Sequence, residues 1–224
     1  MWHEFNSSEE SVRAMVRDIS AVLRQGVAVT GRAGLAVSGG RSPLPLFEAL
    51  SAADLPWKDV HVTLVDDRYV PHDHPDSNEL LVRTHLLKNK ASAATFTGLS
   101  GDGGSIEDAV AQANLQTGEI TLALLGMGED GHTASLFPEA RQLARGLEPG
   151  LADRYIHITP PSAPHERISM TLAALLQARH LMLAISGRKK RDVFEQASRQ
   201  ATPAMPVSYV IAQEGAPFDV YWHA

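Results

Sequence analysis

The chain alternates between two patterns of hydrophobic residues. Ser7 and Glu10 have the spacing of a capping box, and the apolar positions from Val12 to Leu23 recur at helical period, which predicts an opening amphipathic helix. Short, continuously apolar runs predict buried strands at residues 34–37, 60–65, 120–125, 155–158, 181–185 and 207–212. Helical patterns separate them at residues 43–52, 77–87, 106–117, 171–178 and 189–198.

This alternation indicates the fold class. Strands that are apolar on both faces and separated by helices are typical of a mainly parallel sheet with right-handed crossovers. We therefore expect an α/β fold, a Rossmann-like three-layer sandwich with helices on both faces of the sheet. The glycine-rich segment 100–104 has the composition of an ordinary loop before a helix. No long linker divides the 224 residues, so we expect a single domain over residues 1–224.

Ligands of parallel sheets bind at the carboxyl ends of the strands, so the loops after runs 34–37, 60–65 and 120–125 should converge on one pocket. The first loop, Ser38-Gly39-Gly40-Arg41-Ser42, enters a helix that begins at a proline. Its glycines and the helix amino terminus favour a phosphate group. The spacing is that of neither a nucleotide P-loop nor a dinucleotide site, so a small phosphate ester fits better. A tight turn that needs glycine for its geometry alone is equally compatible.

The second loop, residues 65–78, is dense in charged groups. Its opening Asp-Asp-Arg at residues 66–68 could bind hydroxyls, phosphate or a metal. The His-Asp-His at residues 72–74 suggests a metal site, but no established ligand spacing accompanies it. A solvated loop in which Asp76 or Ser77 caps the next helix fits better, and we predict no required metal.

The third loop, residues 126–138, follows the most apolar strand and carries the candidate base. Gly126, Gly128 and Gly131 allow the backbone to approach a ligand closely, and His132 follows them. A histidine at this place can act as a general base near neutral pH. The alternative is a histidine that only caps the following turn.

Two later segments can add positive charge. Arg167 precedes the segment 168–175, and the basic run 188–191 starts a helix after the strand at residues 181–185. Cations at a helix start oppose the helix dipole, so a cluster there favours an anionic partner. A solvated basic face explains most of these side chains, and we expect one or two of them to reach the ligand.

Composition narrows the possible functions. A net charge of −6 and a pI near 5.9 disfavour nucleic-acid binding. Without cysteine there is no disulfide, thiolate metal site or thiol nucleophile. The amino terminus does not resemble a signal peptide, and no apolar run approaches the roughly 18 residues of a membrane helix. We expect a cytoplasmic protein with a small-molecule substrate, no nucleic-acid or membrane partner, and a monomeric or weakly homo-oligomeric state.

Three ordered segments resemble the 6-phosphogluconolactonases, which share a superfamily with glucosamine-6-phosphate deaminase. The segments are LAVSGGRSP at residues 35–43, VDDRYVPHDHPDSN at residues 65–78 and LLGMGEDGHTASLFP at residues 124–138, with weaker support from ERISMTLAAL and SGRKKRDVFE. The resemblance implies hydrolysis of 6-phospho-D-glucono-1,5-lactone to 6-phosphogluconate in the oxidative pentose phosphate pathway, without a cofactor.

The loops and the resemblance together give the candidate site. The expected catalytic residues are His132, Arg68 and Asp130. The expected substrate- or phosphate-binding residues are Ser38, Gly39, Gly40, Arg41, Ser42, Asp67, Gly128, Gly131, Arg167 and Lys189. This chain has Asp67 where the family usually has glutamate, and Ser42 where threonine is frequent. The negative charge at the first position and the hydroxyl group at the second are therefore retained.

The hypothesis for the reaction is that His132 removes a proton from the attacking water. Arg68 or a backbone amide of residues 126–131 would stabilise the oxyanion. Asp130 could orient the imidazole, but residues two apart need not touch, so its role stays open.

Two other functions remain as alternatives. Amino-sugar-phosphate isomerisation and deamination uses a similar Gly-His loop in the related family but continues into an Asn-Glu pair. Here residues 135–138, Ser-Leu-Phe-Pro, supply no such carboxylate. The second alternative is a sugar-phosphate-sensing domain without catalysis. The chain keeps His132 and has no room for a separate helix-turn-helix domain, which disfavours it.

Overall fold

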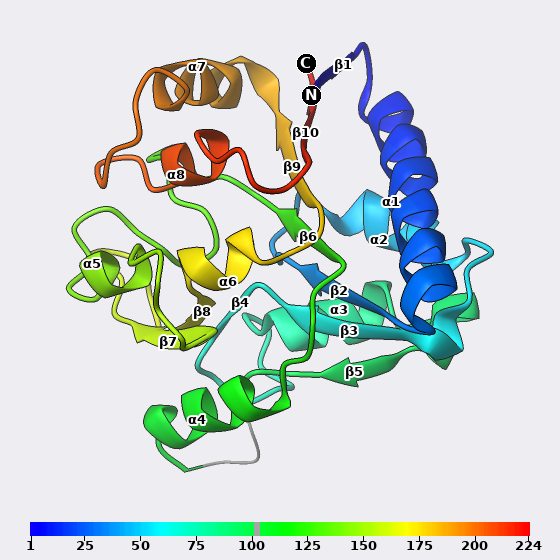
Figure 1. Ribbon diagram of the computed structural model, residues 1–224, viewed down its shortest axis with the longest axis horizontal. Helices are drawn as coiled ribbons and strands as arrows, with labels where there is room; N and C mark the ends of the chain where they lie inside the picture. The colour runs from blue at the N-terminus through cyan, green and yellow to red at the C-terminus, as the bar shows by residue number, and fades with distance from the viewer. Residues whose placement is uncertain (101–103) are drawn as a thin grey trace.

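The computed structural model describes residues 1–100 and 104–224, and its centre is a seven-stranded sheet (Figure 1). The strands, in spatial order, are β1 (Trp2–Phe5), β10 (Phe218–His223), β9 (Leu181–Ser186), β6 (Leu122–Leu125), β2 (Ala33–Val37), β3 (Val60–Leu64) and β5 (Thr95–Thr97). All neighbouring pairs are parallel, which confirms the predicted fold class. Within the predicted loop 100–104, residues 101–103 lie outside the described residues.

Helices lie on both sides of this sheet. They are α1 (Ser8–Thr30), α2 (Leu44–Ser51), α3 (Asn78–His85), α4 (Ile106–Gln116), α5 (Leu143–Gly146), α6 (Leu172–Leu176), α7 (Gly187–Ala197) and α8 (Val207–Ile211), with 3-10 turns at Trp57–Asp59 and Asn89–Ala93. Figure 1 shows α1 on one side of the sheet, and α6, α7 and α8 on the other. The helix that the capping box predicts is present, because Ser7 accepts a bond from the Glu10 amide at the start of α1.

A second, antiparallel sheet was not expected from the sequence. It consists of β4 (Asp66–Arg68), β8 (Arg167–Met170) and β7 (Tyr155–Ile158), in the order β4-β8-β7. Val65 joins the two sheets, because its N–H donates to Val37 of β2 while its carbonyl accepts from Met170 of β8. The second sheet thus begins where β3 ends, at the edge where a parallel sheet binds ligands.

The predicted strand at residues 207–212 is wrong. The segment forms helix α8, which begins after Pro206. A short apolar run is compatible with either a buried strand or a buried helix, and proline is favoured at a helix start, so the pattern was ambiguous. The last strand is β10, which continues the sheet toward β1.

No helix in the part of the chain that the structure describes is both long enough and apolar enough to cross a membrane.

Candidate active site

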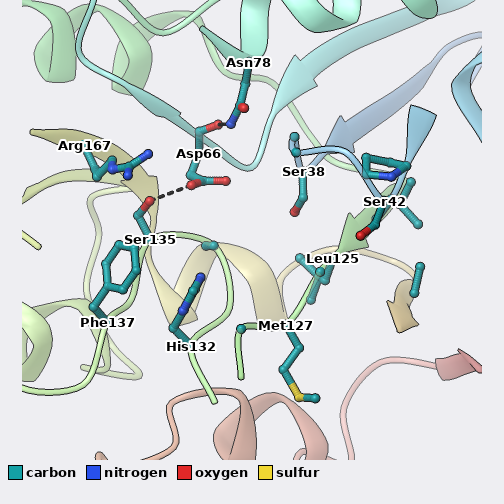
Figure 2. A pocket seen from close by; sticks show the side chains of 18 of the residues that line it. Ser38, Ser42, Asp66, Asn78, Leu125, Met127, His132, Ser135, Phe137 and Arg167 are labelled. Atoms are coloured by element: carbon teal, nitrogen blue, oxygen red, sulfur yellow. Dashed lines mark hydrogen bonds between the residues drawn. The ribbon is translucent and has the colours of Figure 1, made fainter. Parts of the chain in front are cut away.

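A pocket of about 380 Å³ opens at the carboxyl ends of β2 and β6 and beside β4 and β8 (Figure 2). Its wall includes these residues that the sequence singled out: Ser38, Gly39, Gly40, Ser42, Arg68, Gly128, His132 and Arg167. The three loops therefore converge as expected. Figure 2 shows the labelled Ser38 and Ser42 on one side and Asp66 and Arg167 on the other, with His132 below Asp66 and beside Phe137.

The His132 side chain is hydrogen-bonded to the carboxylate of Asp130, two residues before it. Its Nδ1 lies 2.6 Å from Asp130 Oδ1, and the same oxygen accepts the His132 backbone N–H at 3.1 Å. The bond from His132 lowers the pKa of Asp130 against the opposing effect of burial, so this carboxylate stays ionised. A neutral imidazole whose Nδ1–H donates to a carboxylate keeps Nε2 free to accept a proton. The pair thus provides the orienting partner that sequence spacing left open.

Gly128 makes room for this pair. A Cβ atom at Gly128 would lie 2.2 Å from His132 Nδ1 and 2.4 Å from Asp130 Oδ1, so no side chain fits there. Gly131, with φ +80°, forms the bend just before the histidine, and its carbonyl accepts a bond from Val207 at the start of α8. Gly131 is therefore a structural residue of the loop and does not line the pocket.

The two arginines lie directly opposite each other on neighbouring strands. Arg68 of β4 pairs with Arg167 of β8 in the antiparallel register. Arg167 is only 6% exposed, and burial followed by the charge of Arg68 lowers its pKa. Its Nε has no hydrogen-bond partner among the described residues. Two like charges placed side by side at a pocket wall are unfavourable unless an anion joins them, so this wall is suited to an anionic group.

Asp67 does not line the pocket, which corrects the expectation that it binds substrate. Successive strand residues point to opposite faces, so in β4 the neighbouring Asp66 faces the pocket instead. Ser135 donates to Asp66 Oδ2 at 2.5 Å, as the dashed line in Figure 2 shows. Asp67 points inward and accepts backbone N–H groups at the start of α3.

The buried position of Asp67 leads to a prediction about pH. Burial raises the pKa of Asp67 to about 6, against the opposing effect of N–H donors from Asn78, Glu79 and Arg68. A carboxyl whose pKa is higher in the folded than in the unfolded chain stabilises the fold fully below its unfolded value, and this contribution is lost as the pH rises through about 6. We expect its carboxyl carbon to titrate near this value in an NMR experiment. A midpoint below its ordinary value of 3.8 would contradict this assignment.

The first loop is joined to the second through Asn78. A Cβ at Gly39 would lie 1.9 Å from Asn78 Oδ1, so the close approach of the two loops requires glycine there. The Asn78 amide donates to the Asp66 carbonyl at 2.9 Å, and its oxygen accepts from Arg68 at 3.2 Å. Ser38 Oγ is buried without a partner in the described part of the chain, which leaves it free for a ligand.

Arg41 and Lys189, which the sequence placed in the phosphate site, do not line the pocket in this structure. Arg41 is exposed at the end of the first loop. The Lys189 ammonium pairs with Glu129 at the surface, whereas Lys190, the next residue of α7, lies on the pocket wall. Consecutive helix residues point about 100° apart, so the two lysines leave the helix in different directions. Burial lowers the pKa of Lys190, as expected for a cation in a pocket.

The lysine pair offers a matched test. We expect Lys190→Ala to raise the KM for a phosphorylated substrate about tenfold or more, because a charged hydrogen bond to phosphate is lost. Lys189→Ala should leave KM near the wild-type value, since that side chain faces solvent. Steady-state kinetics of both variants measures the difference. An equal effect of the two substitutions, or a larger one at Lys189, would contradict the placement of Lys190.

Sequence reasoning missed several residues of the pocket wall. They include Asp66, Asn78, Ser135, Phe137 and Lys190. All lie in segments that the sequence had singled out, but their orientation depends on strands and helices whose register was unknown. The ring of Phe137 packs against that of His132, with 4.3 Å between the two centroids.

Within residues 1–100 and 104–224, no three histidine, aspartate, glutamate or cysteine side chains are grouped so that they could hold a metal ion. The His-Asp-His at residues 72–74 lies before the Ser77 cap of α3. His74 Nδ1 accepts the Asp76 backbone N–H at 3.1 Å, so it is engaged in the turn.

Comparison with known proteins places the chain in a family. A family model described as glucosamine-6-phosphate isomerases/6-phosphogluconolactonase matches residues 6–222. A 6-phosphogluconolactonase of Neisseria meningitidis is 41% identical over 99% of this chain and 98% of its own length. The crystal structure of a 6-phosphogluconolactonase from Shewanella baltica superposes with a TM-score of 0.94 at 36% identity, covering 100% of this chain and 97% of that one. The chain belongs to the glucosamine-6-phosphate isomerase/6-phosphogluconolactonase family.

Proposed function

We propose that this protein hydrolyses 6-phospho-D-glucono-1,5-lactone to 6-phosphogluconate, a step of the oxidative pentose phosphate pathway, without a cofactor. The observation that carries the proposal is the Asp130–His132 pair at a pocket whose opposite wall holds Arg68 and Arg167. Relatives of similar length, such as the protein from Neisseria meningitidis, are named for this activity. We infer that the protein acts in the cytoplasm, as a monomer or a weak homo-oligomer.

His132 acts as the general base in this proposal. With Nδ1–H donated to Asp130, Nε2 removes a proton from water as its oxygen attacks the lactone carbonyl carbon. The bond between that carbon and the ring oxygen then breaks. The imidazolium returns its proton to the ring oxygen, which becomes the hydroxyl of the open acid. Asp130 stabilises the imidazolium between these two steps.

The arginine pair stabilises the negative charge that develops on the carbonyl oxygen. The backbone amides of Gly128 and Gly131 are not free to bind this oxygen. The Gly128 N–H already donates to the His132 carbonyl, and the Gly131 N–H donates to the Gly128 carbonyl. Arg68 and Arg167 both line the pocket as charged donors, and Arg167 Nε is free of any partner in the described residues. Charged donors held in place before the reaction act most strongly in a site that excludes water.

The first loop and Lys190 bind the phosphate. The unpartnered Ser38 hydroxyl, the adjacent glycines and the start of α2 provide donors and partial positive charge. The phosphate lies far from the reacting carbon in the substrate, so its binding energy serves to hold the ring against His132.

A coupled assay tests this function. The lactone is generated enzymatically, and the release of acid or the formation of 6-phosphogluconate is followed with and without the protein. We expect a rate well above spontaneous hydrolysis. A rate equal to the spontaneous one would remove the proposed function and leave the fold unaffected.

A further inference from the structure

Both pocket arginines are held by backbone carbonyls of their neighbouring loops. Arg68 donates from Nη1 to the Asp76 carbonyl at 2.7 Å. Arg167 donates from Nη2 to the Pro164 carbonyl at 3.0 Å. The directions of the two guanidinium groups therefore depend on the backbone of these loops, and not only on strands β4 and β8.

A side-chain contact joins the two loops, which are residues 69–77 and 159–166. Asp76 Oδ2 lies 3.0 Å from His165 Nε2, although the two residues are 89 positions apart in the chain. The ring of His74 lies edge-on to that of His165, with 5.6 Å between centroids. Asp76 thus binds Arg68 through its backbone carbonyl and His165 through its side chain. His165 in turn directly follows Pro164, whose carbonyl binds Arg167.

The backbone at His165 is strained. Its φ is +68°, a left-handed conformation that residues with a side chain adopt rarely. Such a conformation persists only where surrounding contacts hold it, and the bond to Asp76 is a contact of this kind. Pro164 precedes this residue directly, so a relaxation at His165 moves the carbonyl that Arg167 binds.

The contact between Asp76 and His165 is better suited to positioning the two loops than to stabilising the fold. The side chains of His165 and Asp76 are 29% and 56% exposed, and ion pairs at such sites contribute little to folding. The bond from His165 lowers the pKa of Asp76, and the nearby charges of His74 and Arg68 act in the same direction. Neither side chain lines the pocket, whereas Ala163, in the same loop, does.

We propose that Asp76 and His165 form a latch between the two loops, and that this latch positions Arg68 and Arg167 for the carbonyl oxygen of the substrate. The proposal rests on the proposed function of the pocket. Asp76 and His165 are positioning residues, because they act on the substrate only through the arginines.

Opening the latch should lower kcat and leave the phosphate site intact. Asp76→Ala removes the acceptor of the contact but keeps the backbone carbonyl that Arg68 uses, and His165→Asn keeps a residue that tolerates positive φ. We expect each to lower kcat about tenfold with KM within about twofold, because the arginines act on charge that develops during the reaction. The double variant should be no slower than either single one, since both break the same contact. Exchange of the two residues, Asp76→His with His165→Asp, should restore part of the rate.

A matched control is available at another histidine–carboxylate pair. His85 lies 2.7 Å from Glu48 with similar exposure, away from the pocket wall, and His85→Asn should leave kcat unchanged. Urea unfolding of every variant shows that the kinetics come from folded protein. Wild-type kcat in both single latch variants, or losses that multiply in the double variant, would overturn the latch.

If the wild-type protein shows no turnover, the proposed function fails. The latch is then judged by calorimetric binding of 6-phosphogluconate: its carboxylate, unlike the neutral carbonyl of the lactone, carries a full charge that the arginines bind, so its affinity should fall in both variants.

Discussion

Replacement of His132 by alanine is expected to lower kcat by about 10²- to 10⁴-fold, the range for loss of a general base. The physical reason is that no other group takes the proton of the attacking water once the imidazole is gone. The rate is measured at saturating lactone by the coupled assay and corrected for spontaneous hydrolysis.

The matching control for His132→Ala is ligand binding. The arginine pair and the first loop remain in this variant, so 6-phosphogluconate should bind with an affinity within a few-fold of wild type in a calorimetric titration. A variant that keeps wild-type kcat would disprove the role of His132. A variant that loses both binding and rate would show that the substitution had damaged the pocket.

Asp130→Asn has the second-largest expected effect, a fall in kcat of about 100-fold with little change in KM. Asparagine preserves the shape of the side chain but removes the charge that stabilises the imidazolium, and its amide can favour the wrong tautomer of His132. Glu129→Gln is the control, because Glu129 is exposed and contacts Lys189 outside the pocket. Steady-state kinetics gives kcat for both variants, and only Asp130→Asn should fall below the wild-type value. Equal rates would exclude a special role for Asp130.

The convergence of the three loops could be predicted from the sequence because parallel sheets place the carboxyl ends of their strands together. That rule was enough to bring His132, Ser38 and Arg68 to one pocket. The second sheet could not be predicted, since β4 and β8 are short and their pairing joins distant parts of the chain. The direct opposition of Arg68 and Arg167, which gives the pocket its positively charged wall, followed only from the structure.

Two differences between the predicted site and the pocket wall have a common cause. Asp67 was chosen where Asp66 faces the pocket, and Lys189 where Lys190 does. In each case the charged neighbours are adjacent, and a shift of one residue reverses the face of a strand or turns a helix position by about 100°. A motif identifies such a pair, but the choice within it requires the register of the element that carries it.

In the proposed mechanism, Asp130 holds the His132 imidazole so that Nε2 serves as the base. The ¹⁵N NMR spectrum of the imidazole in the ligand-free enzyme, at a pH where the ring is neutral, tests this arrangement. We expect a protonated Nδ1 and an unprotonated Nε2 in the wild-type enzyme, and a mixture of both tautomers in Asp130→Asn. A neutral wild-type ring protonated at Nε2 would disprove the role of Asp130.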